Sequence, residues 1–161
     1  MENTKMQEYI GTKIIHADPA WRLTGRDGHK HIVPIDEKPE LRDGENLEEG
    51  YKVIYSDGYE SWSPKAVFEH SYRPVDRLNF GLAIEAMKMG FKCARQGWNG
   101  KNQYVELATC ISYKNGDDEI VNVEHCNIGN KALAFVGTSG VQMGWLASQA
   151  DMLADDWRIV G

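Results

Sequence analysis

The clearest hydrophobic period in the chain occurs in residues 79–90, NFGLAIEAMKMG. Apolar residues spaced i, i+3, i+4 and i+7 lie on one face of a helix. The residues at that spacing here are Phe80, Ala83, Ile84 and Met87. Asn79 can cap the first turn, and Gly90 can end the helix in the left-handed region. The pattern predicts a helix with one buried face.

Downstream of this helix, short apolar runs bounded by turn residues predict strands. Asn99-Gly100 is a strong signal for a two-residue hairpin between the first two of them. Residues 112–130 are polar, contain a second Asn-Gly pair and predict a hairpin excursion. The predicted strands are FKCAR (91–95), QYVELATCI (103–111), ALAFV (132–136), VQMGW (141–145) and DDWRIV (155–160).

The first half of the chain is predicted to be mostly β. IGTKIIHA (10–17) has the length and the β-branched content of a strand. Residues 24–50 are rich in Gly, Pro, Asp and Glu and predict a loop. YKVIYSDGYESW (51–62) predicts a hairpin, with Asp57-Gly58 at its turn.

Two shorter helices are predicted from their capping residues. SPKAVFEHSY (63–72) has Ser63 as a natural N-cap and Pro64 at the first helical position. SQADMLA, near the C-terminus, begins with Ser148 and carries Asp151 three residues later. This pair is a capping box with Asp in place of the usual Glu.

The chain divides into two predicted domains near Pro74, which cannot continue the preceding helix. Residues 1–75 are predicted to form a small β-rich module that ends in a short helix. Residues 77–161 follow the order helix, antiparallel strands, short helix, strand. The predicted fold class is therefore α+β.

Composition and charge restrict the class of protein. The chain has 161 residues, of which 42% are hydrophobic and 26% charged, as in ordinary globular proteins. A net charge of −6 argues against a nucleic-acid polymer as the main partner. No apolar run is long enough to span a membrane, and the N-terminus lacks the features of a signal peptide. Three cysteines without a CxxC motif predict free thiols in a reducing cytoplasm.

The stretch ARQGWNGK (94–101) concentrates a tryptophan and cations in an acidic chain, where Lys92, Arg95 and Lys101 form a local basic patch. Residues 1–76 carry 10 Lys+Arg and 15 Asp+Glu, whereas residues 77–161 carry 8 and 9, so the second half can host an anion locally. The flat ring of Trp98 can stack on a base. Arg95 and the backbone N–H groups of a Gly-containing turn can bind phosphate oxygens. Alternatively, the turn is purely structural, the tryptophan packs a hairpin edge and the cations are solvated.

A second cluster, GWLASQADMLADDW (144–157), places Trp145 just before the start of the short helix. The free N–H groups at that start can receive an anion. The side chains of Ser148 and Gln149 can hydrogen-bond ribose hydroxyls or a base edge. In the alternative interpretation, Ser148 and Asp151 only cap the helix, and the two roles can coexist.

These two blocks resemble the Thoeris anti-defence proteins of the second type, a small phage-encoded family. The family pattern contains A-L-x-x-L-x-x-G, then R-x-G-W-N-G-K, then W-x-x-S-Q-x-D-x-L-A-x-D-W. The resemblance covers residues 78–161, with Ala147 where Pro is common, and the first half resembles a short module at the head of many small phage proteins. The matching residues are Ala83, Met87, Gly90, Arg95, Gly97, Trp98, Asn99, Gly100 and Lys101, then Trp145, Ser148, Gln149, Asp151, Leu153, Ala154, Asp156 and Trp157.

The resemblance implies a non-catalytic sponge without a cofactor. It would sequester cyclic ADP-ribose isomers made by bacterial TIR defence proteins, in the cytoplasm of the infected host, as a homo-oligomer (dimer or tetramer) with sites at subunit interfaces. It assigns the adenine or ribose to Trp98 and Trp145. It assigns the diphosphate to Arg95, Asn99, Gly100 and Lys101. It assigns the ribose hydroxyls to Ser148, Gln149 and Asp151.

Other functions stay open from the residues alone. Catalysis is less favoured, because Asp155 and Asp156 are adjacent and would point to opposite faces of a strand. His125 and Cys126 have no second histidine nearby, and the HKH motif (29–31) has no metal-ligand spacing, so no metal site is predicted. The remaining alternatives are a sponge for cyclic oligonucleotides and a phage structural or protein-interaction module that binds no nucleotide.

Overall fold

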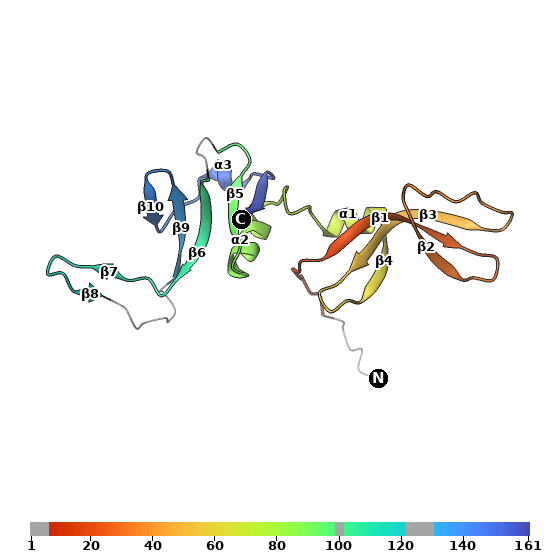
Figure 1. Ribbon diagram of the computed structural model, residues 1–161, viewed down its shortest axis with the longest axis horizontal. Coiled ribbons are helices and arrows are strands. Elements are labelled where there is room, and N and C mark those ends of the chain that lie inside the picture. The colour runs from red at the N-terminus through yellow and green to blue at the C-terminus, as the bar shows by residue number, and fades with distance from the viewer. Residues whose placement is uncertain (1–6, 99–101, 122–130) are drawn as a thin grey trace. The chain divides into compact units, whose positions relative to one another are not determined.

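The computed structural model of the protein describes residues 7–98, 102–121 and 131–161. Its contacts divide the chain into two compact units, of which the first ends at Tyr72 and the second begins at Arg73 (Figure 1). Both units combine helix with antiparallel strands, so the predicted α+β class is confirmed.

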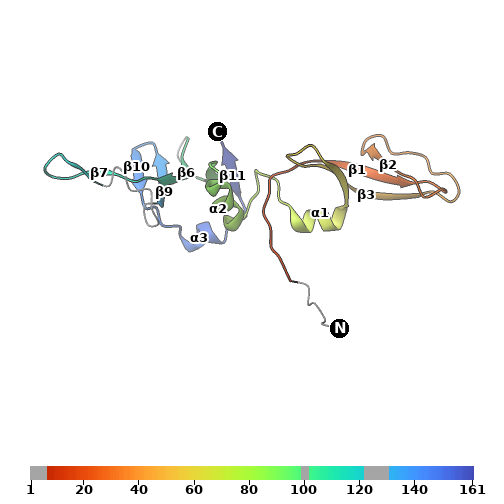
Figure 2. The same ribbon diagram turned by 90° about the horizontal axis from the view of Figure 1, so that it is seen from below.

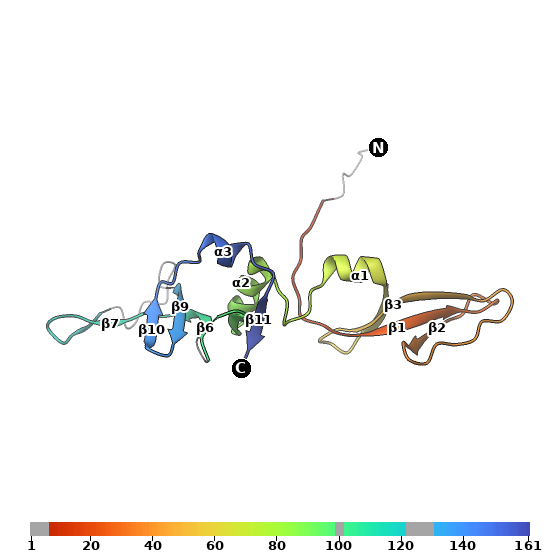
Figure 3. The same ribbon diagram turned by 90° about the horizontal axis from the view of Figure 1, so that it is seen from above.

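The first unit is a four-stranded antiparallel sheet with a helix on one face (Figure 3). Its elements are β1 (His16–Thr24), β2 (Lys30–Pro34), β3 (Asn46–Ile54), β4 (Glu60–Pro64) and α1 (Lys65–Ser71). The strand order is β2-β1-β3-β4, and β1 pairs with β3 from His16↔Ile54 to Thr24↔Asn46. The helix α1 packs on this sheet because Phe68 stacks on Tyr51, with ring centroids 4.0 Å apart.

The strand and loop predicted for residues 10–50 are wrong in part. The first strand begins only at His16, and Ile10 and Ile14, on which the prediction rested, are 100% and 40% exposed. The predicted loop over 24–50 contains all of β2 and half of β3. These strands are polar because one face of the sheet carries no helix, so their pairing with β1 is not reflected in hydrophobicity.

The hairpin predicted for residues 51–62 is confirmed as β3–β4. Gly58 takes a φ of +83° at its turn, a conformation that favours glycine. The helix that follows is also confirmed, but its cap is not. Ser63 lies in β4 opposite Tyr51, and Pro64 occupies the N-cap position without a side-chain hydrogen bond. The serine is engaged in the strand ladder and is therefore not available to cap the helix.

The second unit contains a five-stranded antiparallel sheet in the order β10-β9-β6-β5-β11, and both of its helices lie on one face (Figure 2). A small separate hairpin is formed by β7 and β8. The elements are α2 (Phe80–Lys88), β5 (Lys92–Arg95), β6 (Tyr104–Thr109), β7 (Tyr113–Lys114), β8 (Ile120–Val121), β9 (Lys131–Gly137), β10 (Gly140–Met143), α3 (Gln149–Met152) and β11 (Trp157–Val160).

The helix predicted for residues 79–90 is confirmed as α2. The Asn79 side chain accepts a hydrogen bond from the backbone N–H of Leu82 at 2.9 Å, and Gly90 has a φ of +95°. The apolar face of the helix packs on the sheet. The fully buried core that results is built from Ala83, Met87, Cys93, Val105 and Trp157.

Two further predictions for this unit have mixed outcomes. The Asn99-Gly100 turn lies outside the described residues, and the described strands that flank it end at Arg95 and begin again at Tyr104. The hairpin predicted within 112–130 is present as β7–β8. The expectation of free thiols holds for the buried Cys93 but is wrong for Cys110, which is disulfide-bonded.

Candidate functional site

The two sequence blocks converge on a cluster of aromatic rings in the second unit. Trp98 follows β5, Trp145 precedes α3, and Trp157 opens β11. The ring centroid of Trp98 lies 6.0 Å from that of Trp145, 5.4 Å from that of Trp157 and 5.3 Å from that of Phe135 in β9. All three pairs are edge to face. This is a favourable geometry for aromatic pairs. Trp157 is fully buried, whereas Trp98 and Trp145 are only half-buried, so part of each of these two rings faces solvent.

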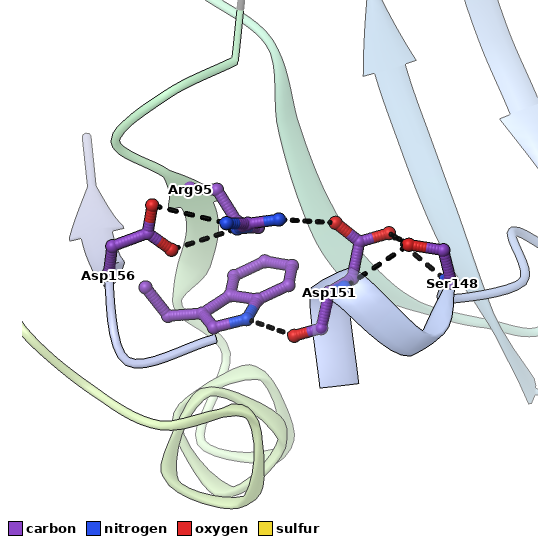
Figure 4. A network of polar contacts seen from close by, with 5 residues as sticks. Arg95, Ser148, Asp151 and Asp156 are labelled. Carbon is purple, nitrogen blue, oxygen red and sulfur yellow. Dashed lines mark hydrogen bonds and ion pairs between the residues drawn. The ribbon is translucent and has the colours of Figure 1, made fainter. Parts of the chain in front are cut away.

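Arg95 joins the same two blocks through ion pairs (Figure 4). Its Nε and Nη2 donate to the two carboxylate oxygens of Asp156 at 2.8 and 3.3 Å, and its Nη1 donates to Asp151 at 3.1 Å. The Arg95 side chain is only 22% exposed. β11 brings Asp156 to this place, because Trp157 pairs with Arg95 in the sheet register. A planar guanidinium thus bridges two carboxylates and ties α3 to β5.

The start of α3 is fixed by the predicted capping box, which is confirmed. The Asp151 amide donates to the Ser148 hydroxyl at 3.1 Å, and the Ser148 amide donates to the Asp151 carboxylate at 3.0 Å. The indole N–H of Trp157 donates to the Asp151 carbonyl at 2.8 Å. The short helix is therefore anchored to the buried tryptophan as well as to Arg95.

These contacts shift the pKa values of Asp151 and Arg95. Burial by itself raises the pKa of the Asp151 carboxyl. Hydrogen bonds from the Ser148 hydroxyl and amide and from Arg95 outweigh burial and hold that pKa below its usual value. The hydrogen bonds to Asp156 and then to Asp151 raise the pKa of Arg95. One permanent cation therefore faces two anions, which leaves this cluster with a net negative charge.

The structure brings five of the predicted ligand-binding residues into one continuous cluster. They are Arg95, Trp98, Trp145, Ser148 and Asp151. Gln149 is exposed at the first position of α3. Asn99, Gly100 and Lys101 lie outside the described residues. Whether any of these residues contacts a ligand stays a prediction.

A cavity of about 270 Å³ adjoins the aromatic cluster, and the sequence did not single it out. The side chains that characterise it are Lys92, Arg95, Trp98, Asn102, Tyr104 and Arg158. Lys92 belongs to the basic patch noted in the sequence, whereas Arg158, directly after Trp157, was not singled out. Only strand pairing shows that they meet, because they are 66 positions apart (158 − 92).

Two other classes of feature, metal-binding clusters and membrane-spanning helices, are absent from the described part of the chain. No group of three or more His, Cys, Asp or Glu side chains there is arranged to hold a metal ion. No helix of that part has the length and apolarity needed to cross a membrane.

Two comparisons with known proteins match this unit. The family model described as "Thoeris anti-defense 2-like domain" matches residues 78–160. The protein "Thoeris anti-defense 2" of Bacillus phage SP01 is 36% identical over 89 residues, an alignment that covers 52% of this chain and 96% of the relative. The resemblance expected from the two sequence blocks is confirmed, and the family match leaves out residues 1–77.

Proposed function

The chain belongs to the Thoeris anti-defense 2-like family through residues 78–160, and we propose that it is a phage anti-defence protein that works by sequestration. In this proposal it binds a cyclic ADP-ribose-type signal made by bacterial TIR immune proteins in the infected cell. It holds the signal away from the effector and does not degrade it. The protein acts in the host cytoplasm as a homo-oligomer, a dimer or a tetramer.

The observation that carries the proposal is the meeting of Trp98 and Trp145, which are 47 positions apart in the chain (145 − 98). Each ring is half-buried, so its inner edge is held by packing while its outer part can contact a ligand. An aromatic ring that stacks on a base contributes roughly 1–3 kcal/mol. Because both rings are held in place before binding, little side-chain freedom is lost when the ligand arrives.

The Arg95 network supports the site in a different way from the one first expected. Three of its N–H groups donate hydrogen bonds to Asp151 and Asp156. A guanidinium carries five N–H groups, so two remain for a phosphate oxygen. The surrounding carboxylates oppose a second anion there. In the proposal, Arg95 chiefly positions α3, from which Ser148 and Gln149 contact ribose hydroxyls. The remaining lone pairs of the Asp151 carboxylate accept hydrogen bonds from the same ribose hydroxyls.

The remaining predicted residues, Asn99, Gly100 and Lys101, are proposed to contribute backbone N–H groups and one ammonium to binding of the diphosphate. The energy required is attainable. Nanomolar binding needs about −12 kcal/mol. Two stacked rings and two or three charge-assisted hydrogen bonds of roughly 1.5–3 kcal/mol each approach that value before the entropy of association is subtracted.

Signal recovery distinguishes a sponge from an enzyme. The product of a TIR defence protein is mixed with the full chain, and activation of the effector is measured before and after the mixture is heat-denatured. The proposal expects activation to be lost and then fully restored by heating. Activation that is lost and never restored would indicate degradation. Activation that is never lost would exclude this ligand, and cyclic oligonucleotides would be tested next.

Two tryptophan variants localise the activity. Trp98→Ala is expected to abolish sequestration, because it removes one of the two proposed stacking rings. Trp21→Ala is the matched control, since Trp21 lies in the first unit, where its indole N–H donates to the Ile35 carbonyl at 2.9 Å. Equal activity of both variants would exclude Trp98 from the site. Loss in both would assign a part of the site to the first unit.

A further inference from the structure

Part of the lining of the cavity beside Trp98 comes from the sheet face opposite α2. In the register of β5 and β11, Arg158 pairs with Ala94 and Val160 pairs with Lys92. Directly paired residues in an antiparallel sheet point to the same face, and so do residues two apart on one strand. Cys93, between Lys92 and Ala94, is buried in the core with α2. Lys92 and Arg158 therefore share the other face, and their strands bring them close together.

The charge of this cavity is opposite to that of the chain. Its lining residues include the cations Lys92, Arg95 and Arg158 and no aspartate or glutamate, in a protein with a net charge of −6. The charge of Arg95 is balanced by two aspartates. Within the described residues, by contrast, neither Lys92 nor Arg158 forms an ion pair with an acidic side chain. Two uncompensated cations on neighbouring strands attract an anion.

The neighbouring groups suit a phosphate ester attached to a flat ring. The Lys92 ammonium lies 4.6 Å from the ring centroid of Tyr104, which holds the cation over the cavity side of the sheet. Asn102, which carries a side-chain amide, also lines the cavity. Trp98 belongs to both the cavity lining and the aromatic cluster. A molecule that contacts Trp98 can therefore extend its phosphate groups toward Lys92 and Arg158.

The volume sets which part of such a ligand fits. Sites that enclose a drug-sized molecule measure about 300–1,000 Å³, and this cavity, at about 270 Å³, lies just below that range. It is large enough for a diphosphate but not for a whole dinucleotide. The base and ribose then remain outside the cavity, on the side of Trp98 and Trp145.

We propose that Lys92 and Arg158 bind the phosphate groups of the sequestered nucleotide on the open face of the sheet. The identity of the nucleotide rests on the proposed function, whereas the phosphate site does not. In this arrangement the base and the phosphates of the nucleotide bind at two adjoining places. Aromatic rings near α3 contact the base, and the cations Lys92 on β5 and Arg158 on β11 bind the phosphates.

Calorimetric titrations of the full chain test this division with three probes: cyclic ADP-ribose, inorganic pyrophosphate and adenosine. Lys92→Gln and Arg158→Gln are each expected to weaken binding of the first two probes by about tenfold or more, because each removes one charge-assisted contact to phosphate. Adenosine, which has no phosphate, should bind both variants as it binds the unmodified chain. Lys131→Gln is the matched control, an equal loss of charge at an exposed residue of β9 outside the cavity lining.

The outcomes separate the two proposals. If the unmodified chain binds cyclic ADP-ribose and both variants bind it equally well, the phosphate site is wrong while the sponge function stands. If cyclic ADP-ribose does not bind but pyrophosphate binds and is lost in the variants, the phosphate site stands and the nucleotide assignment is wrong. If neither phosphate probe binds, both proposals are overturned. A parallel loss of adenosine binding or of melting temperature would show that the substitutions act through the fold, which also overturns the site.

Discussion

Replacement of Arg95 by methionine tests whether the network at the start of α3 is structural. Methionine fills much of the same space without a charge. Arg95→Met therefore removes the hydrogen bonds to Asp151 and Asp156 while it retains most of the packing. The two carboxylates are left without the cation between them. Because they come from α3 and from the start of β11, their repulsion acts on the attachment of both elements to β5.

The exposure of the three side chains sets the expected magnitude. Arg95, Asp151 and Asp156 are 22%, 15% and 34% exposed. Exposed ion pairs contribute about 0–1 kcal/mol, whereas removal of one partner from a buried pair costs about 3–5 kcal/mol. A partly buried network lies between these limits, so the free energy of unfolding of the second unit should fall by about 2–3 kcal/mol. In domains of about 60–100 residues, 1 kcal/mol corresponds to roughly 4–8 °C, so Tm should fall by about 10 °C or more.

Urea denaturation followed by tryptophan fluorescence measures this loss, since the aromatic cluster lies beside the network. Adding Asp156→Asn to Arg95→Met should recover part of the stability, because it removes one of the two unpaired carboxylates. Arg158→Met is the control, an exposed arginine on the adjacent strand, for which a change within about 0.5 kcal/mol is expected. If Arg95→Met also changes the stability by less than about 0.5 kcal/mol, the network is not structural and Arg95 is available for the ligand.

Three further outcomes follow from single contacts. The carboxyl of Asp151 has a lowered pKa in the folded chain, so its contribution to stability is complete above the unfolded pKa of about 3.9 and is lost as pH falls through the folded pKa. In urea titrations below about pH 4, Asp151→Asn should therefore lose less of its free energy of unfolding than the unmodified chain does. Gly50→Ala would place a Cβ 2.2 Å from the Ser63 carbonyl oxygen and 2.5 Å from the Trp62 ring. Thermal melting should therefore show the first unit destabilised by about 3 kcal/mol, while the second unit keeps its Tm. Burial raises the pKa of the Cys93 thiol to about 11, so mass spectrometry should find the peptide that contains Cys93 unlabelled by a thiol reagent at about pH 8 until the chain is unfolded.

The helices and tight hairpins were predictable from the sequence because their signals are local. Asn79 and Gly90 mark the ends of α2 within a few residues of its apolar face. The capping box depends on two residues three positions apart. The hairpin at Gly58 depends on a single turn that needs a positive φ. Each of these features is decided by neighbouring residues, so tertiary structure had little to add.

The edges of the first sheet were not predictable in the same way. Ile10 and Ile14 have the β-branched side chains of a strand but no partner in the sheet, whereas the polar residues of β2 pair with β1 from Thr24↔Lys30 to Ala20↔Pro34. Strand formation there depends on backbone hydrogen bonds to a distant segment. Side-chain hydrophobicity does not report those bonds when one face of the sheet is open.

The sequence by itself determined the family, the α+β class and the two blocks from which the candidate site is built. Only the tertiary structure decided how those blocks meet. It paired Arg95 with Asp156, 61 positions away. The sequence suggested this arginine for phosphate binding, but in the fold it forms ion pairs that hold α3. It also brought Lys92 and Arg158 to one face of the sheet, where their charges are unpaired within the described residues. Charge balance depends on which side chains become neighbours, and in a sheet that is fixed by strand order and register, neither of which is written in any single stretch of the chain.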